Sequence, residues 1–194
     1  MRRLNALIDA VTQTRDPKLL VSFVPQFRAC TVRKNETLIA QGDVWNRAFF
    51  VEHGLLHTHL VDRAGKSCSN SFYSEGSLIF PLTQQLELHA SLFSISSLER
   101  STVWSVDINL FRTALQTHGL WEDLRVELLA RLLHRKLQRE YELVMLDGTQ
   151  RYLRFCGNMP DLADRVPLAH IASYLGLTDV SLSRIRRRLR EKPA

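Results

Sequence analysis

The residues best suited to a defined chemistry lie near the end of this 194-residue chain, where residues 171–190 read "IASYLGLTDVSLSRIRRRLR". Residues 184–192 alone carry six positive charges and one negative charge, a net charge of +5, whereas the whole chain carries +6. Guanidinium groups bind phosphates, and they bind the O6 and N7 atoms of guanine, through paired hydrogen bonds. Because nearly all of the net charge is concentrated in one short segment, the sequence favours a polyanion as the partner.

Apolar residues accompany these charges at helical spacing. The inward positions of two short helices are expected to be Ile171, Ala172, Leu175, Leu182, Ile185 and Leu189. Gly176 can adopt the positive φ that a tight turn between the helices requires, and the Thr178 hydroxyl can cap the second helix. This pattern is typical of a helix-turn-helix, whose second helix enters the major groove of DNA. A helical hairpin with a solvated basic face is the alternative interpretation.

The outward side of the second helix supplies the candidate DNA-binding residues. Arg184 lies one turn into the helix, where a guanidinium can bind a guanine, whereas Arg187 and Arg188 are expected to bind phosphates. Serine hydroxyls suit base edges or phosphates, and a threonine at the helix N-terminus suits a phosphate. The predicted set is Thr178, Val180, Ser181, Ser183, Arg184, Arg187 and Arg188.

A second candidate site is the His57-x-His59 pair, because alternate side chains of a strand point to the same side. With Asp62 and His89 these histidines could bind a metal ion, which would make the protein a cupin-like enzyme or metal sensor. Against this, an aspartate stands where cupins usually carry a glutamate. We therefore expect an exposed histidine pair, no metal, no cofactor and no catalytic residue.

The chain ahead of these motifs changes its pattern twice. Residues 1–28 have helical spacing, and residues 31–108 are short apolar runs separated by turns at Gly42-Asp43, Ala64-Gly65-Lys66 and Glu75-Gly76. Many short strands at regular spacing predict an antiparallel barrel or jelly roll. Residues 120–145 then contain neither proline nor glycine, which predicts a helix about 40 Å long.

An apolar stripe runs along this long helix, formed by Val126, Leu129, Leu133, Leu137, Tyr141 and Val144. It could pack within the chain or pair with a second copy; we expect a homodimer. The predicted fold class is α+β, divided into a β-roll with N-terminal helices (residues 1–119), a long connecting helix (120–146) and a helix-turn-helix domain (147–194).

Composition agrees with a folded chain of one or two domains, since 45% of the residues are apolar and 24% are charged. No apolar run reaches the roughly 20 residues of a membrane helix, and the N-terminal segment lacks the apolar centre of a signal peptide. We expect a cytoplasmic protein with no membrane partner. The three cysteines are far apart and form no CxxC pair, which argues against an iron–sulfur or zinc site.

Several motifs together resemble the CRP/FNR family of bacterial transcription regulators. The glycine turns in "LIAQGD", "FFVEHGLL", "DRAGK" and "YSEGSLI" are similar to those of that family's β-roll, and "FSISSLERSTVWSVD" to its last strands. "TQRYLRFCGNMPDL" and "VPLAHIASYLGLTDVSLSRIRRRL" are similar to its DNA-binding domain. The resemblance implies a non-enzymatic regulator that dimerises through the long helix and has double-stranded DNA and RNA polymerase as partners. A pure interaction protein, with the basic segment serving only solubility, is the third interpretation.

The same resemblance makes cyclic AMP an unexpected ligand. Phe80 and Pro81 stand where family members carry a Gly-Glu pair, and Ser91 and Leu92 stand where they carry the Arg-Ser or Arg-Thr pair that holds the phosphate. Val180 likewise replaces a glutamate found in many recognition helices. The effector is unassigned, and the candidate lining is Phe72, Phe80, Pro81, Leu82, Ser91, Leu92 and Phe93. We favour a roll that serves as a scaffold, since a core explains the same aromatic residues.

Overall fold

The computed structural model describes residues 24–191, so the predicted N-terminal helix lies largely outside the described residues. The chain divides into two units. Unit 1 comprises Met1–Thr58 and Phe72–Leu132, and unit 2 comprises His59–Ser71 and Leu133–Ala194. No helix within residues 24–191 is long and apolar enough to cross a membrane. The predicted domain limits at residues 119 and 146 stay predictions.

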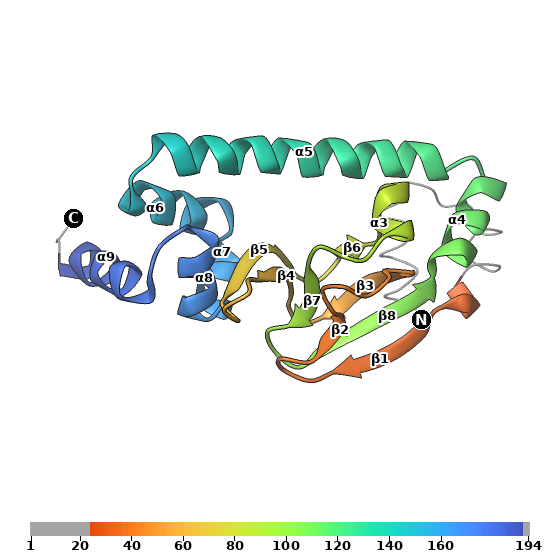
Figure 1. Ribbon diagram of the computed structural model, residues 1–194, viewed down its shortest axis with the longest axis horizontal. Coiled ribbons are helices and arrows are strands. Elements are labelled where there is room, and N and C mark those ends of the chain that lie inside the picture. Colours follow the sequence, from red (N-terminus) through yellow and green to blue (C-terminus); the bar gives the residue numbers. More distant parts are fainter. Residues whose placement is uncertain (1–23, 192–194) are drawn as a thin grey trace. The chain divides into compact units, whose positions relative to one another are not determined.

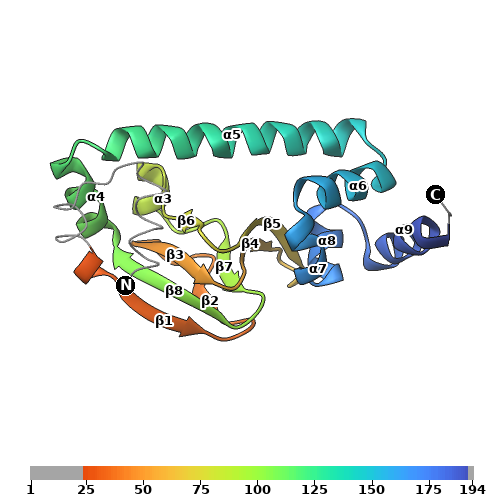
Figure 2. The same cartoon turned by 180° about the vertical axis from the view of Figure 1, so that it is seen from behind.

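The strands form two four-stranded sheets (Figures 1 and 2). The first sheet has the order β1-β8-β3-β6, with β1 (Arg28–Val32), β8 (Ser101–Asp107), β3 (Arg47–His53) and β6 (Leu78–Ile79). The second has the order β2-β7-β4-β5, with β2 (Thr37–Ile39), β7 (Ser94–Ser97), β4 (Leu56–Val61) and β5 (Ser67–Tyr73). The pairs β1–β8, β3–β8, β3–β6 and β2–β7 are antiparallel. The expected β-roll is confirmed.

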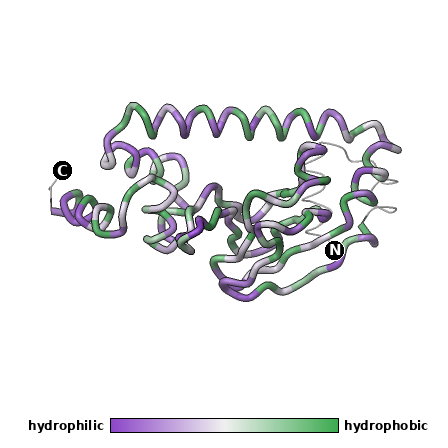
Figure 3. The backbone as a smooth tube through the Cα atoms, viewed as in Figure 1, coloured by the Kyte–Doolittle hydropathy of each residue, from purple (hydrophilic) through white to green (hydrophobic). Residues whose placement is uncertain are grey.

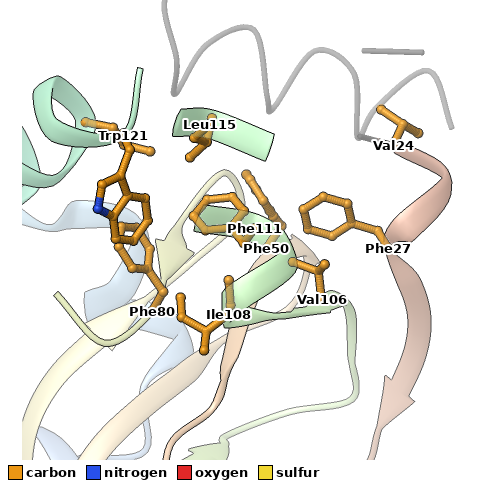
Figure 4. Close-up of a cluster of buried hydrophobic side chains, with 11 residues drawn as sticks. Val24, Phe27, Phe50, Phe80, Val106, Ile108, Phe111, Leu115 and Trp121 are labelled. Atoms are coloured by element: carbon orange, nitrogen blue, oxygen red, sulfur yellow. The ribbon is translucent and has the colours of Figure 1, made fainter. Parts of the chain in front are cut away.

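The described residues of unit 1 include two hydrophobic clusters, because residues on opposite faces of its strands are buried. The first is aromatic (Figure 4): Phe111 makes edge-to-face contacts with Phe80 (5.2 Å between ring centroids) and Trp121 (6.1 Å). Such pairs stabilise a core beyond the area they bury. The second cluster lies around Phe49, Val51 and Ile95. The short elements η1 (Val24–Gln26), α3 (Gln84–Leu88) and α4 (Ile108–Thr117) also belong to this unit.

The predicted long helix is α5 (Trp121–Met145). Its first turn is anchored by Trp121 and Leu124, which are 5% and 4% exposed and belong to the aromatic cluster. Unit 2 continues with α6 (Gly148–Asn158), α7 (Pro160–Arg165), α8 (Leu168–Tyr174) and α9 (Asp179–Glu191). The break after α5 comes from Asp147, whose carboxylate accepts from the N–H groups of Thr149 and Gln150 and so starts α6.

Candidate nucleic-acid interface

The turn between α8 and α9 is closed by backbone hydrogen bonds around a glycine. Gly176 has a φ of +66°, in the left-handed region that glycine adopts without steric cost. Its N–H donates to the Ser173 carbonyl (3.2 Å), and the Leu177 N–H donates to the Ala172 carbonyl (2.8 Å). These two bonds form a Schellman motif, which terminates α8 and redirects the chain. The role predicted for Gly176 is confirmed.

The N-terminus of α9 is capped by a threonine, as predicted. Thr178 Oγ1 accepts from the Ser181 N–H (3.2 Å), and the two hydroxyl oxygens lie 2.8 Å apart. The Thr178 carbonyl accepts the first helical bond from Leu182 (3.0 Å). Asp179 in the first turn adds a negative charge where the helix dipole favours one.

The inward face of this helix pair is buried as the spacing predicted. Ile171, Ala172, Leu175, Leu182 and Ile185 are between 0% and 5% exposed. Leu189, near the end of α9, is only half-buried. These apolar residues fix the direction in which α9 presents its other side.

The opposite side of α9 is exposed and includes Arg184, Arg187 and Arg188. Val180, Ser183, Arg184 and Arg187, together with Asp179, line a shallow hollow of about 380 Å³. Four of the predicted DNA-binding residues therefore share one surface. Thr178 and Arg188 are exposed outside that lining, and Ser181 is half-buried. Their roles toward DNA stay predictions.

The two histidines of β4 are not the exposed pair that we expected. His57 is 3% exposed and His59 is half-buried on β4, because other parts of the chain cover the side of the sheet to which these two side chains point. Asp62 instead stabilises the β4–β5 turn, where its carboxylate accepts from the N–H groups of Ala64 and Lys66 (both 2.9 Å). Within residues 24–191 no three His, Cys, Asp or Glu side chains are grouped to hold a metal ion. The cupin-like alternative thus finds no support.

The predicted effector residues do not all lie together. Phe80 and Leu82 belong to the aromatic cluster around Phe111, whereas Phe93 packs against the second cluster. Leu92 is 70% exposed, and Ser91 is buried, with its hydroxyl donating to the Phe93 carbonyl (2.6 Å). Phe72 and Pro81 are also buried. Most of this set therefore fills the interior of unit 1.

The predicted dimer stripe is exposed on the single chain. Val126, Leu133, Leu137, Tyr141 and Val144 are between 51% and 75% exposed, and Leu129 is half-buried. Hydrophobic residues recur between hydrophilic ones along the whole of α5 (Figure 3). Large apolar side chains exposed in a row on one helix mark a surface that a partner can cover.

A polar cavity in unit 2 was not anticipated from the sequence. About 300 Å³ in volume, it is lined by Arg135, Gln138, Arg139, Glu142, Phe155, Asn158, Met159 and Tyr174. Its four α5 residues lie on the side of that helix opposite the apolar stripe, by the 3.6-residue period. The only indication of this cavity in the sequence was that Arg135 and Arg139 are one helical turn apart and so lie on the same side of the helix.

No family model matches the sequence, and no curated protein is similar to it. Solved structures are nevertheless similar in fold. FixK2 from Bradyrhizobium japonicum superposes with a TM-score of 0.74 at 16% identity, over 84% of each chain. The c-di-GMP-responsive global regulator CLP from Xanthomonas campestris has a TM-score of 0.74 at 13% identity, over 90% of this chain and 92% of that one. A CRP/FNR-family transcriptional regulator from Eubacterium rectale has a TM-score of 0.71 at 11% identity, over 90% and 83%.

The chain thus has a two-part fold, in which a β-roll is followed along the sequence by a long helix and a helix-turn-helix. It is the fold of the CRP/FNR transcription regulators. The α+β class and the family resemblance predicted from the sequence are confirmed at the level of the fold.

Proposed function

We propose that this protein is a sequence-specific DNA-binding transcription regulator that acts as a homodimer. The observation that carries the proposal is the division of α9 into a buried apolar side and an exposed side with several arginines. A helix held rigidly from one side can present guanidinium groups to a groove at a fixed register. A loose basic segment would bind DNA without that register, and so without base preference.

Within this interface, Arg184 is the proposed base reader. It shares the hollow on α9 with Val180 and Ser183, so these three side chains would meet the base edges together. Arg187 and Arg188 lie further along the helix and would bind phosphates, which orients the protein without reading sequence.

The test is selection of binding sites from random duplex DNA, followed by titration of variants against the selected site. Arg184→Ala should weaken specific binding by about 1–3 kcal/mol and relax the preference at one base position of each half-site. Arg188→Ala should weaken binding to all sequences alike and lower the salt dependence by about one counterion. An unchanged base preference in Arg184→Ala would show that another residue reads the base.

The homodimer proposal rests on the exposed stripe of α5. Leu133, Leu137 and Val144 are 60%, 57% and 75% exposed on the single chain, although leucine and valine are usually buried. A parallel or antiparallel copy of α5 would cover them with the same residues. A two-fold symmetric dimer would also present two copies of α9 to two half-sites.

Independence from cyclic nucleotides is supported by the packing at three of the four substituted positions. Phe80 is 3% exposed and lies against Phe111 and Trp121, so its place is filled by an aromatic core. Ser91 is a buried hydroxyl bonded to backbone, and Leu92 points to solvent. Neither supplies the positive charge that a buried phosphate diester needs. We place this regulator in the cytoplasm, with DNA and RNA polymerase as partners and no catalytic role.

A further inference from the structure

The unanticipated cavity of unit 2 lies among α5, α6 and α8 and combines charge with aromatic surface. Two of its side chains are arginines on α5. Arg139 donates from Nη2 to the carbonyl of Tyr174 (2.9 Å), the last residue of α8. Its Nε atom is buried and has no hydrogen-bond partner among the described residues. A buried donor without a hydrogen-bond partner lowers the stability of the fold, and an acceptor that bound to it would remove this cost.

The acidic residue of the cavity does not supply that acceptor. The Glu142 carboxylate accepts from Gln138 (3.3 Å) and lies 3.6 Å from a guanidinium nitrogen of Arg154. The negative charge of Glu142 is therefore paired with Arg154 and not with Arg135 or Arg139. Burial lowers the pKa of the neighbouring Lys136, and the positive charges of Arg139 and Arg135 lower it further. The cavity is thus suited to an added negative charge.

Aromatic rings form another part of the wall, which Gln138, Asn158 and Met159 also line. Phe155 is 3% exposed, and its ring centroid lies 5.8 Å from that of Tyr174. The Arg139 guanidinium carbon lies 5.0 Å from the centre of the Tyr174 ring, a cation–π contact that keeps the guanidinium beside the aromatic surface. Burial also raises the pKa of Tyr174. A ligand here would meet aromatic rings next to hydrogen-bond donors.

We propose that this cavity binds a small organic anion, in which a carboxylate or phosphate group is joined to a flat apolar body. The anionic oxygens would accept from Arg135 and from the Nε of Arg139, and the apolar body would pack on Phe155 and Tyr174. The volume of about 300 Å³ is at the small end of known ligand sites. Because the cavity faces away from the apolar stripe of α5, a ligand and a second copy of the chain could bind together.

This site would give the protein an effector contact outside the β-roll. Arg139 belongs to α5 and Tyr174 to the first helix of the helix-turn-helix, so one ligand would touch both elements. An influence of the ligand on DNA affinity rests on the proposed function, whereas binding of the ligand does not.

The test uses the full chain without DNA and two anionic probes, benzoate and phenyl phosphate, with neutral benzamide for comparison. Binding is followed by nuclear magnetic resonance titration. For probes of about ten atoms we expect dissociation constants of about 1–10 mM and at least about tenfold weaker binding of benzamide. Arg135→Gln is the variant of choice, since Arg135 is exposed whereas Arg139 holds the end of α8. This substitution should raise the dissociation constants of both anions about tenfold.

Arg131→Gln is the matched control. Arg131 lies one turn before Arg135, is ion-paired with Glu127 and does not line the cavity. Its loss removes the same charge, so it should change affinity by less than about twofold. Preference for one probe would identify the anionic group as carboxylate or phosphate. The proposal fails if neither anion binds, if benzamide binds equally well, or if Arg131→Gln weakens binding as much as Arg135→Gln. Any of these results would leave the DNA-selection experiment unaffected.

Discussion

Replacement of Leu182 by alanine tests whether the helix-turn-helix depends on its buried face. Leu182 is 0% exposed between α8 and α9. The change removes three carbon atoms, worth about 2.4 kcal/mol at about 0.8 kcal/mol for each buried methylene. A residual cavity adds to this cost, and measured Leu→Ala changes in protein cores range from about 2.7 to 5 kcal/mol. We expect unit 2 to lose about 3 kcal/mol of unfolding free energy.

The distribution of tryptophans allows the two units to be followed separately. Trp45, Trp104 and Trp121 are the three tryptophans of the chain, and all belong to unit 1. Tryptophan fluorescence therefore reports the unfolding of unit 1, while far-UV circular dichroism is dominated by helices. In urea, Leu182→Ala should move the helical transition down by about 2–3 M, for a slope of about 1–1.5 kcal/mol per M. The fluorescence transition should stay in place.

Val180→Ala is the matched control on the same helix. Val180 is 59% exposed, so its loss should change stability by less than about 0.5 kcal/mol. The reasoning would be refuted by equal destabilisation in the two variants. A Leu182→Ala variant in which fluorescence and dichroism shifted together would show instead that the two units unfold as one.

Three further outcomes are expected. Leu133→Asp should place an unpaired charge in the apolar stripe of α5 and raise the dissociation constant of the homodimer at least about 100-fold, as measured by light scattering. Arg131→Gln should leave the homodimer intact. A wild-type protein that is monomeric at micromolar concentration would contradict this prediction. Cyclic AMP and cyclic GMP should shift neither the melting temperature nor the DNA affinity, and a saturable shift would mean that other residues hold the phosphate. Burial lowers the pKa of His59, and nearby His170 lowers it further, so the native state binds fewer protons than the unfolded chain. Stability should therefore fall as the pH falls through about 6.5, and His59→Gln should reduce that slope; an equal slope in both proteins would refute the assignment.

Local signals in the sequence were sufficient for the elements and for the helix-turn-helix. A segment without proline or glycine predicted a helix over residues 120–145, and α5 spans Trp121–Met145. Gly176 and Thr178 were identified because a left-handed turn and a helix cap each depend on the side chain at one position. Such features involve residues only a few positions apart, so spacing alone defines them.

Features that depend on which segments meet in space were predicted less well. The histidines of β4 were expected at the surface, but the face of the sheet to which His57 points is covered, and His57 is 3% exposed. The aromatic residues assigned to one effector lining are divided between two clusters. Alternation along a strand shows that two faces exist, and it does not show what covers either of them.

The long helix shows why periodicity alone could not reveal the cavity. Its stripe through Leu133 and Leu137 is the most apolar one, and it is exposed on the single chain. The opposite side begins with Leu124 in the core of unit 1 and changes to arginines at Arg135 and Arg139. A hydrophobic pattern identifies the apolar stripe of a helix and treats every residue on the other side simply as polar. It therefore gives no sign that this other side includes a buried guanidinium nitrogen. Charged residues that recur one turn apart, opposite an apolar stripe on a helix too long for one domain, therefore merit the same attention as the stripe itself.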